Sequence, residues 1–197
     1  MKATITSLIF LLLSLTVSSQ TYKYIGIEEG LSNQKIYKIQ KDARGYMWFL
    51  THVGIDQYNG KEIKHYKLRE GNRELDPLLN INWTFLDKTG TLLVTGKQGR
   101  IFRYDSGHDR FVQIYSMYNY WNKDYHAFVR YSYIDQEDNV WLCGKSAIHL
   151  FNIESGQKQQ ISNRLGNITC IEQINSEHFF IGTDKKNLSG QNWKTGI

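Results

Sequence analysis

The sequence predicts an all-β fold, a β-propeller of about three complete four-stranded blades followed by a partial fourth. Three observations support this prediction: short segments of alternating apolar residues, turn residues between these segments, and recurrence of the whole pattern along the chain. Apolar residues at the three- and four-residue spacing of helices are not found. A helical solenoid is therefore a poorer description of the repeat.

Four copies of the repeat are expected, at residues 31–66, 79–114, 128–161 and 167–184. A large apolar residue recurs in the second strand of each copy, at intervals of 45, 48 and 39 residues: Trp48, Leu93, Trp141 and Phe180. A period near 45 residues is typical of a propeller blade. We interpret the two tryptophans as packing residues between adjacent sheets rather than as sugar-stacking platforms, because they occupy the same place in successive repeats.

The turn between the first and second strands supports the repeat. It contains Asp42 and Gly45 in the first copy and Asp87 and Gly90 in the second, and it begins at Asp135 in the third. An aspartate side chain can accept bonds from the turn backbone, and a glycine can adopt positive φ. In the third copy an aspartate and an asparagine follow where the glycine is expected, and asparagine also tolerates that conformation. We expect these residues to be structural.

The first 19 residues have the features of a secretory signal peptide. Lys2 precedes an apolar run over residues 8–15, and small residues stand before Gln20. This run is shorter than the roughly 20 apolar residues that span a bilayer, so an uncleaved anchor is the weaker interpretation. The exported part would be residues 20–197, a partial propeller with no membrane span.

Composition excludes some classes of partner. The formal net charge of +5 is mild, and basic residues alternate with acidic ones, which does not support nucleic-acid binding. Cys143 and Cys170 both lie in predicted strands of an exported chain, where a disulfide is allowed. Two buried free thiols are the favoured interpretation. No metal site is expected, since neither cysteine has a second ligand at suitable spacing.

The first repeat closely resembles the two-component regulator propeller repeat. The resemblance rests on Gly30-Leu31-Ser32-Asn33, then on residues 42–48 with their Asp-x-x-Gly-x-x-Trp pattern, then on residues 54–60. It extends over about residues 22–184, although residues 49–52 and 185–190 depart from the family pattern. The segment at residues 22–27 is expected to be a strand of the kind that completes the last blade of a closed propeller.

This resemblance implies a periplasmic sensor region of a hybrid two-component system, whose repeats build one or two seven-bladed propellers. It implies a glycan fragment as ligand, and a parent protein with a membrane helix and a histidine kinase. The expected partners are then an oligosaccharide and either the remainder of the propeller or a homodimer partner. A secreted, non-enzymatic propeller that serves as a scaffold for protein interactions is the alternative.

An aromatic-rich stretch between the second and third repeats is the candidate binding region. It runs from Tyr115 to Tyr133, and the residues chosen as candidate ligand contacts are Trp121, Tyr125, His126 and Arg130. Aromatic rings stack on the apolar faces of sugars, and a cation suits an acidic sugar. A connecting loop that covers the propeller with its own aromatics is an equally good interpretation. No catalytic motif, cofactor motif or phosphate loop is present, so we expect a protein that is not an enzyme and needs no cofactor.

Overall fold

A computed structural model describes residues 22–77, 81–117, 128–184 and 189–192 of the chain. The predicted signal peptide lies outside these residues. The described part forms three four-stranded antiparallel sheets, one three-stranded sheet and a two-stranded hairpin. This confirms the predicted all-β architecture.

Each of the first three sheets is a meander in which consecutive strands pair. Blade 1 contains β1 (Ile36–Lys41), β2 (Met47–Thr51), β3 (Ile55–Tyr58) and β4 (Ile63–Tyr66). Blade 2 contains β7 (Trp83–Leu86), β8 (Leu92–Thr95), β9 (Arg100–Asp105) and β10 (Arg110–Ser116). Blade 3 contains β11 (Tyr131–Ile134), β12 (Asn139–Cys143), β13 (Ala147–Asn152) and β14 (Lys158–Ser162).

The fourth sheet is shorter, and one hairpin was not expected. Blade 4 contains β15 (Ile168–Asn175), β16 (His178–Thr183) and β17 (Ser189–Asn192). The third of these strands lies beyond the end of the predicted repeat. The hairpin of β5 (Arg69–Glu70) and β6 (Arg73–Glu74) occupies the connection from blade 1 to blade 2.

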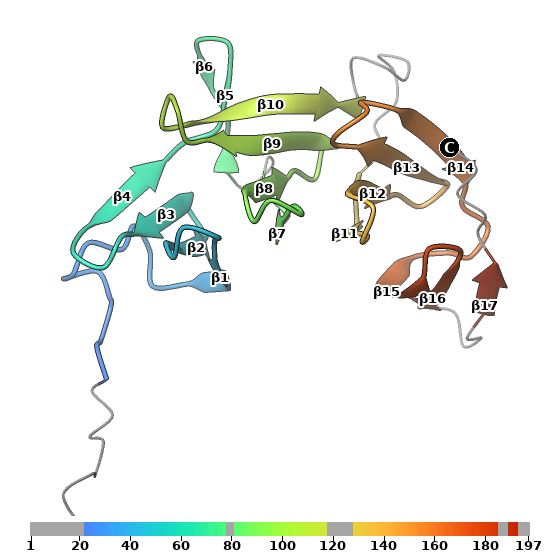
Figure 1. Ribbon diagram of the computed structural model, residues 1–197, viewed down its shortest axis with the longest axis horizontal. Helices are drawn as coiled ribbons and strands as arrows, with labels where there is room; N and C mark the ends of the chain where they lie inside the picture. The colour runs from blue at the N-terminus through green and yellow to red at the C-terminus, as the bar shows by residue number, and fades with distance from the viewer. Residues whose placement is uncertain (1–21, 78–80, 118–127, 185–188, 193–197) are drawn as a thin grey trace, which may run out of the picture.

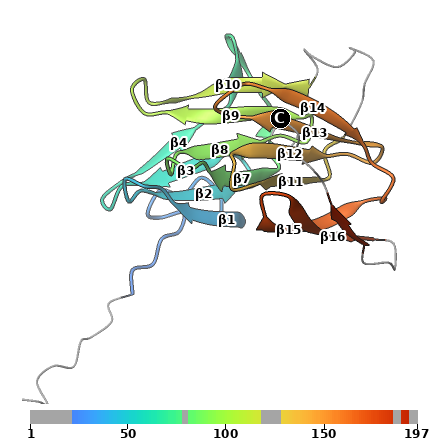
Figure 2. The ribbon, with the colours of Figure 1, turned by 45° about the vertical axis from the view of Figure 1, so that its right-hand side comes forward.

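The four sheets form an arc. Figure 1 shows the first strand of each blade, β1, β7, β11 and β15, on the concave side, and β4, β10 and β14 on the convex side. Figure 2 shows the sheets stacked side by side along the arc. Successive blades therefore pack face to face, as in a propeller.

The core consists of three apolar layers between neighbouring blades. Trp48 of blade 1 packs among residues of blade 2, with its ring 4.8 Å from that of Tyr104 and 5.7 Å from that of Phe111. Leu93 packs against blade 3 in the second layer, and Trp141 packs against Phe179 of blade 4 in the third. The side chain at this repeat position is buried under the next blade in all three cases.

Phe180 occupies the same position in blade 4, but 61 % of it is exposed. Its neighbours Phe179 and Ile181 alternate with it along the strand and point back into the layer shared with blade 3. Phe180 therefore points away from blade 3, toward the side where a following blade would pack. The described chain contains no such blade.

The predicted aspartates fold the turns through one repeated set of bonds. One carboxylate oxygen of Asp42 accepts the N–H groups of Arg44 and Tyr46 at 2.9 Å, and the other accepts the indole N–H of Trp48 at 2.8 Å. Asp135 does the same for Glu137, Asn139 and Trp141, at 3.0, 2.8 and 2.9 Å. The carboxylate thus joins the turn to the packed tryptophan.

In blade 2 a guanidinium takes the place of the indole as the partner of the turn aspartate. Asp87 accepts the N–H groups of Thr89 and Thr91 at 2.9 Å, but Leu93 has no donor to offer. Instead Arg103 of the adjacent strand forms an ion pair with the second oxygen of Asp87 at 2.7 Å. The buried carboxylate therefore keeps a partner.

The turns also bond to one another across blades. The Ala43 N–H donates to the Gly90 carbonyl at 3.1 Å, the Lys88 N–H to the Asp138 carboxylate at 3.0 Å, and the Gln136 N–H to the Gln173 side-chain oxygen at 2.7 Å. The donor is the residue after the turn aspartate in each blade. These bonds set the spacing of neighbouring blades.

Positive φ is found where the turn requires it, with one difference from the prediction. Gly45 and Gly90 have φ values of 86° and 72°. In the third turn Asp138 itself adopts a φ of 61°, so the following asparagine is not needed for this role. Asp138 also accepts the Lys88 N–H, a bond that a glycine could not accept through a side chain.

Two expectations are corrected by the structure. Residues 22–27 form coil and a turn rather than a strand, because no sheet edge of the described chain lies beside them. Cys170 is exposed, although Cys143 is buried, and both thiols are free. Cys170 is exposed because it lies on β15, in the blade that no further blade covers.

Replacing Trp48 by phenylalanine should destabilise the fold by about 2–3 kcal/mol, because it deprives the buried Asp42 carboxylate of a donor and leaves a small cavity. Urea denaturation monitored by circular dichroism measures the effect. Trp141→Phe should cost a similar amount, since Asp135 makes the same bonds. A loss below about 0.5 kcal/mol in both variants would contradict the assigned role.

Gly90→Ala should destabilise the chain more than Gly60→Ala. Both glycines have positive φ, at 72° and 99°, but a Cβ at Gly90 would lie 2.5 Å from the Ala43 Cβ, whereas a Cβ at Gly60 meets nothing within 4 Å. The Gly60 variant measures the backbone strain alone, about 1 kcal/mol. A larger loss of stability in Gly90→Ala than in Gly60→Ala would report the contact between the turns of blades 1 and 2. Equal losses of stability in the two variants would exclude it.

His149 should make the fold sensitive to mild acid. It is 1 % exposed, and burial lowers its pKa from 6.5 to about 4. The unfolded chain therefore binds a proton at this residue before the folded chain does, so stability is full above pH 6.5 and falls as the pH drops toward 4. Between pH 7 and 5.5 we expect a loss of about 1 kcal/mol from this group.

Urea denaturation at the two pH values tests this expectation in His149→Gln, which should lose that part of the pH dependence. The control is His178→Gln, at the start of β16, which should retain it. An unchanged pH dependence in His149→Gln would show that the imidazole does not contribute.

Candidate ligand-binding site

The arc has two faces, which differ in the loops they carry. One carries the turns that begin at Asp42, Asp87 and Asp135, and we call it the Asp-turn face. Because strands alternate in direction, the opposite face carries the turns between second and third strands and the connections between blades. We call it the connection face. The turns of the Asp-turn face are fixed by the repeated bonds to their aspartates.

A cavity of about 210 Å³ opens on the connection face between blades 1 and 2. The residues that line it and carry rings or polar groups are Tyr37, Thr51, His52, Asn82, Trp83 and Lys97. We call it the connection-face pocket. These residues come from β1, from the end of β2 and the turn after it, from the start of β7 and the residue before it, and from the turn after β8. The pocket thus combines residues that are up to 60 positions apart in the sequence.

Tyr37 and His52 form one wall of the pocket. The Tyr37 hydroxyl lies 2.7 Å from His52 Nδ1, within hydrogen-bond distance. The Lys35 ammonium lies 5.2 Å from the centre of the Tyr37 ring, and the Lys35 carbonyl accepts the His52 N–H at 3.1 Å. A phenol ring that is held by a hydrogen bond at its edge keeps one orientation, while 49 % of its surface remains exposed.

Trp83 forms the second aromatic surface, and 40 % of it is exposed. The Lys38 ammonium lies 5.0 Å from the centre of the Trp83 ring and donates to the Thr84 carbonyl at 2.5 Å. Burial lowers the pKa of Lys38 from its ordinary value. Lys38 therefore anchors β1 to β7 and holds the indole in place, rather than offering its charge to a ligand.

The predicted ligand contacts fall mostly outside the described residues. Trp121, Tyr125 and His126 lie there, so the structure does not place them. Arg130 is exposed, and its N–H donates to the Cys143 carbonyl at 2.9 Å. The preceding Val129 N–H donates to the carbonyl of Lys97, which lines the connection-face pocket. The segment at Arg130 therefore adjoins the same face as the pocket.

The predicted binding region includes residues that belong to the core. Tyr115 lies in β10, is buried, and stacks on Phe151 with ring centres 4.8 Å apart. Tyr131 and Tyr133 lie in β11 and pack against the apolar layer between blades 3 and 4. These tyrosines belong to the core because their side chains pack in the apolar layers between neighbouring blades. The sequence prediction also missed Tyr37 and Trp83. The signal available in the sequence was an aromatic residue in the first strand of each of the first two repeats.

A cluster of Ser32, Asp56 and His65 combines residue types found in hydrolases, but its order differs from theirs. Asp56 is buried and accepts the Ser32 hydroxyl at 2.8 Å, while His65 Nδ1 lies 2.8 Å from its other oxygen. The carboxylate thus lies between serine and histidine, so the imidazole contacts the carboxylate and not the serine hydroxyl whose proton it would have to take. The cluster ties the segment before β1 to blade 1.

No group of three or more histidine, cysteine, aspartate or glutamate side chains is placed to hold a metal ion in the described ranges. Within the same ranges, no helix has the length and apolarity that a membrane span needs.

Residues 30–52 match the family model of the two component regulator propeller. The match contains the Asp42 turn and Trp48, which the structure joins through a hydrogen bond. The matched residues contain the first two strands of blade 1. No curated protein matches the chain significantly in sequence.

Solved structures confirm the propeller fold. The extracellular domain of BT3049 from B. thetaiotaomicron, described as a hybrid two component system, is 18 % identical, with a TM-score of 0.62 over 81 % of this chain and 23 % of that domain. The extracellular domain of BT4673 from the same organism, also described as a hybrid two component system, is 16 % identical, with a TM-score of 0.66 over 88 % and 24 %. The chain spans about a quarter of the length of these structures.

Proposed function

We propose that this chain is part of the extracytoplasmic sensor region of a two-component system and that it takes part in detecting a glycan fragment. The match of residues 30–52 to a regulator propeller and the likeness to extracellular sensor domains support the first part. The exposed aromatic surfaces of the connection-face pocket support the second.

The observation that carries the glycan assignment is the pair of exposed rings at one cavity. Tyr37 and Trp83 come from the concave strands of two blades and line the same pocket, with an imidazole, an amide and a lysine beside them. Rings offer flat apolar surfaces to the C–H faces of sugars, and the polar groups can bond to hydroxyls. The pocket volume of about 210 Å³ suits one sugar ring rather than a larger cofactor.

The location and the wider architecture belong to the same proposal. Residues 1–19 act as a signal peptide, and the propeller lies in the periplasm of a protein anchored in the inner membrane. Phe180 supports a longer propeller, because its counterparts in blades 1–3 are all covered by a following blade. Seven blades are the expected number. Binding would then be passed to a histidine kinase of the parent protein, with the blades described here acting as a sensor and not as an enzyme.

Trp83→Ala and Tyr37→Ala should each weaken glycan binding by about five- to tenfold, because each removes one stacking surface worth about 1 kcal/mol. Arg130→Ala should weaken binding of acidic glycans more than of neutral ones. The measurement is isothermal titration of the exported chain, and of the longer parent, with oligosaccharides selected on a glycan array.

Tyr24→Ala is the matched control. Tyr24 is a tyrosine with 76 % exposure in the segment before β1 and does not line the pocket, so its loss should leave affinity unchanged. Unchanged affinity in both Trp83→Ala and Tyr37→Ala would exclude the pocket as the glycan site. Failure of the longer parent to bind any oligosaccharide would contradict the glycan assignment itself.

A further inference from the structure

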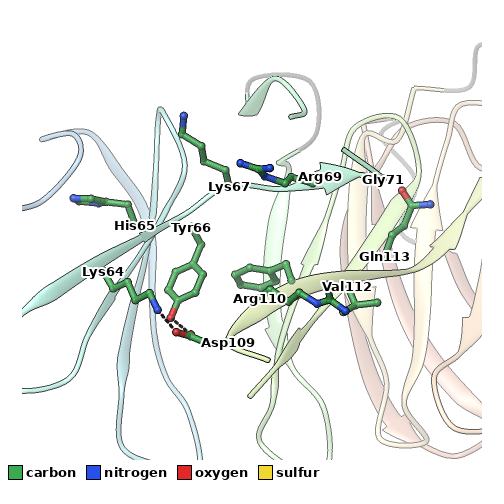
Figure 3. A pocket seen from close by; sticks show the side chains of 11 residues that line it. Lys64, His65, Tyr66, Lys67, Arg69, Gly71, Asp109, Arg110, Val112 and Gln113 are labelled. Carbon is green, nitrogen blue, oxygen red and sulfur yellow. Dashed lines mark hydrogen bonds and ion pairs between the residues drawn. The ribbon is translucent and has the colours of Figure 1, made fainter. Parts of the chain in front are cut away.

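A second cavity lies on the convex side of the arc, between the outermost strands of blades 1 and 2. It has a volume of about 490 Å³ and is lined by β4, by β10 and by residues around β5. Figure 3 shows Lys64 and Asp109 at one end and Gly71 and Gln113 at the other. We call this cavity the rim groove. It shares no lining residue with the connection-face pocket.

The rim groove is basic. Its lining contains Lys64, Lys67, Arg69 and Arg110 and a single carboxylate, Asp109. Asp109 is already engaged by Lys64 and by the hydroxyls of Tyr66 and Tyr104, at 2.6 and 2.7 Å. The groove therefore keeps an excess of positive charge that an acidic partner would balance.

The two arginines of the groove are the cations most accessible to a partner. Both are exposed, and neither forms an ion pair within the part of the chain that the structure describes. Lys67 pairs with Glu74 at 2.8 Å and Lys64 pairs with Asp109, so these two charges are partly neutralised. Arg69 and Arg110 therefore provide most of the available attraction.

The groove also presents unpaired strand edges. In the described sheets β4 pairs only with β3, and β10 pairs only with β9. The N–H and C=O groups on the outer edge of each strand have no strand partner. Such an edge can bind an added strand, through main-chain bonds that give affinity and side-chain contacts that give specificity.

Two side chains on β10 suit an added strand. Val112 is exposed and Phe111 lies at the base of the groove, so the strand offers apolar contact. The side-chain oxygen of Gln113 is buried without a hydrogen-bond partner among the described residues, so it is not offered to a partner. The unpaired main-chain groups of β10 need both donors and acceptors, which a peptide backbone supplies, whereas a sulfated or carboxylated sugar chain supplies mainly acceptors.

We propose that the rim groove binds an extended acidic segment of a partner protein, which adds to the free edge of β10 as a fifth strand of blade 2. The groove residues Arg110–Gln113 span about 13 Å of strand, enough for four residues of a partner. Side chains of an extended segment alternate between faces, so acidic residues at every second position would face blade 1 with Lys67 and Arg69. This site is independent of the proposed glycan site.

The test uses fluorescence anisotropy of the whole exported chain with a labelled, end-blocked peptide of sequence Thr-Glu-Val-Glu-Thr-Glu. Arg69→Glu and Arg110→Glu should each lower its affinity about five- to tenfold, since each replaces an attraction by a repulsion. A peptide N-methylated at alternate residues keeps its charge but loses its main-chain donors, and it should bind at least tenfold more weakly. The matched control is Lys61→Glu, which makes the same change of charge on blade 1 outside the groove and should leave affinity unchanged.

Several results would overturn the proposal. Equal binding of the N-methylated peptide, or equal competition by a heparin hexasaccharide, would show attraction by charge alone without strand addition. Absence of binding by the unmodified peptide, or equal loss in Lys61→Glu and the two arginine variants, would exclude the groove as a peptide site. Circular dichroism of each variant shows whether it is folded, and binding by folded variants decides the outcome.

Discussion

The structure depends on one contact that is repeated between blades, the burial of a side chain of the second strand under the following sheet. Trp48, Leu93 and Trp141 all make this contact and are nearly or fully excluded from solvent. A sheet of four strands has two faces, and each must be covered by another layer. Since the blades have no other cover, each depends on its neighbours for stability.

The turn aspartate allows a tryptophan to occupy this buried position. Burying an indole N–H without an acceptor costs free energy, and the carboxylate of Asp42 or Asp135 accepts it while also holding the turn amides. Where leucine stands in place of tryptophan, Arg103 satisfies the same carboxylate from the next strand. The turn carboxylate is thus paired in blades 1, 2 and 3, although the partner of its second oxygen differs in residue type. In blade 4 Asn175 takes the turn role, accepting the N–H groups of Glu177 and His178 at 3.0 Å.

These repeated bonds occupy the Asp-turn face and the surfaces between blades, which leaves two kinds of surface for binding. The connection face carries turns and linkers that the repeat does not constrain, and there Tyr37 and Trp83 remain exposed beside a cavity. The convex rim carries the outermost strands, which pair on one side only because the sheets diverge from one another. The first surface is lined by rings and suits a sugar, while the second is lined by cations and free backbone and suits an acidic strand.

The sequence by itself determined the blade repeat, the turns at Asp42, Asp87 and Asp135, and the packing role of Trp48 and Trp141. These features are local, since strand periodicity and turn chemistry act within a few residues. It did not identify the turn at Asn175, because that turn lacks the aspartate and its second N–H donor lies three residues on instead of four. Only the tertiary structure decided that Tyr115 is buried, that Phe180 is exposed, and that Tyr37 and Trp83 meet at one pocket. The physical reason is that these properties depend on which residues of neighbouring blades come together, and those residues lie tens of positions apart in the chain.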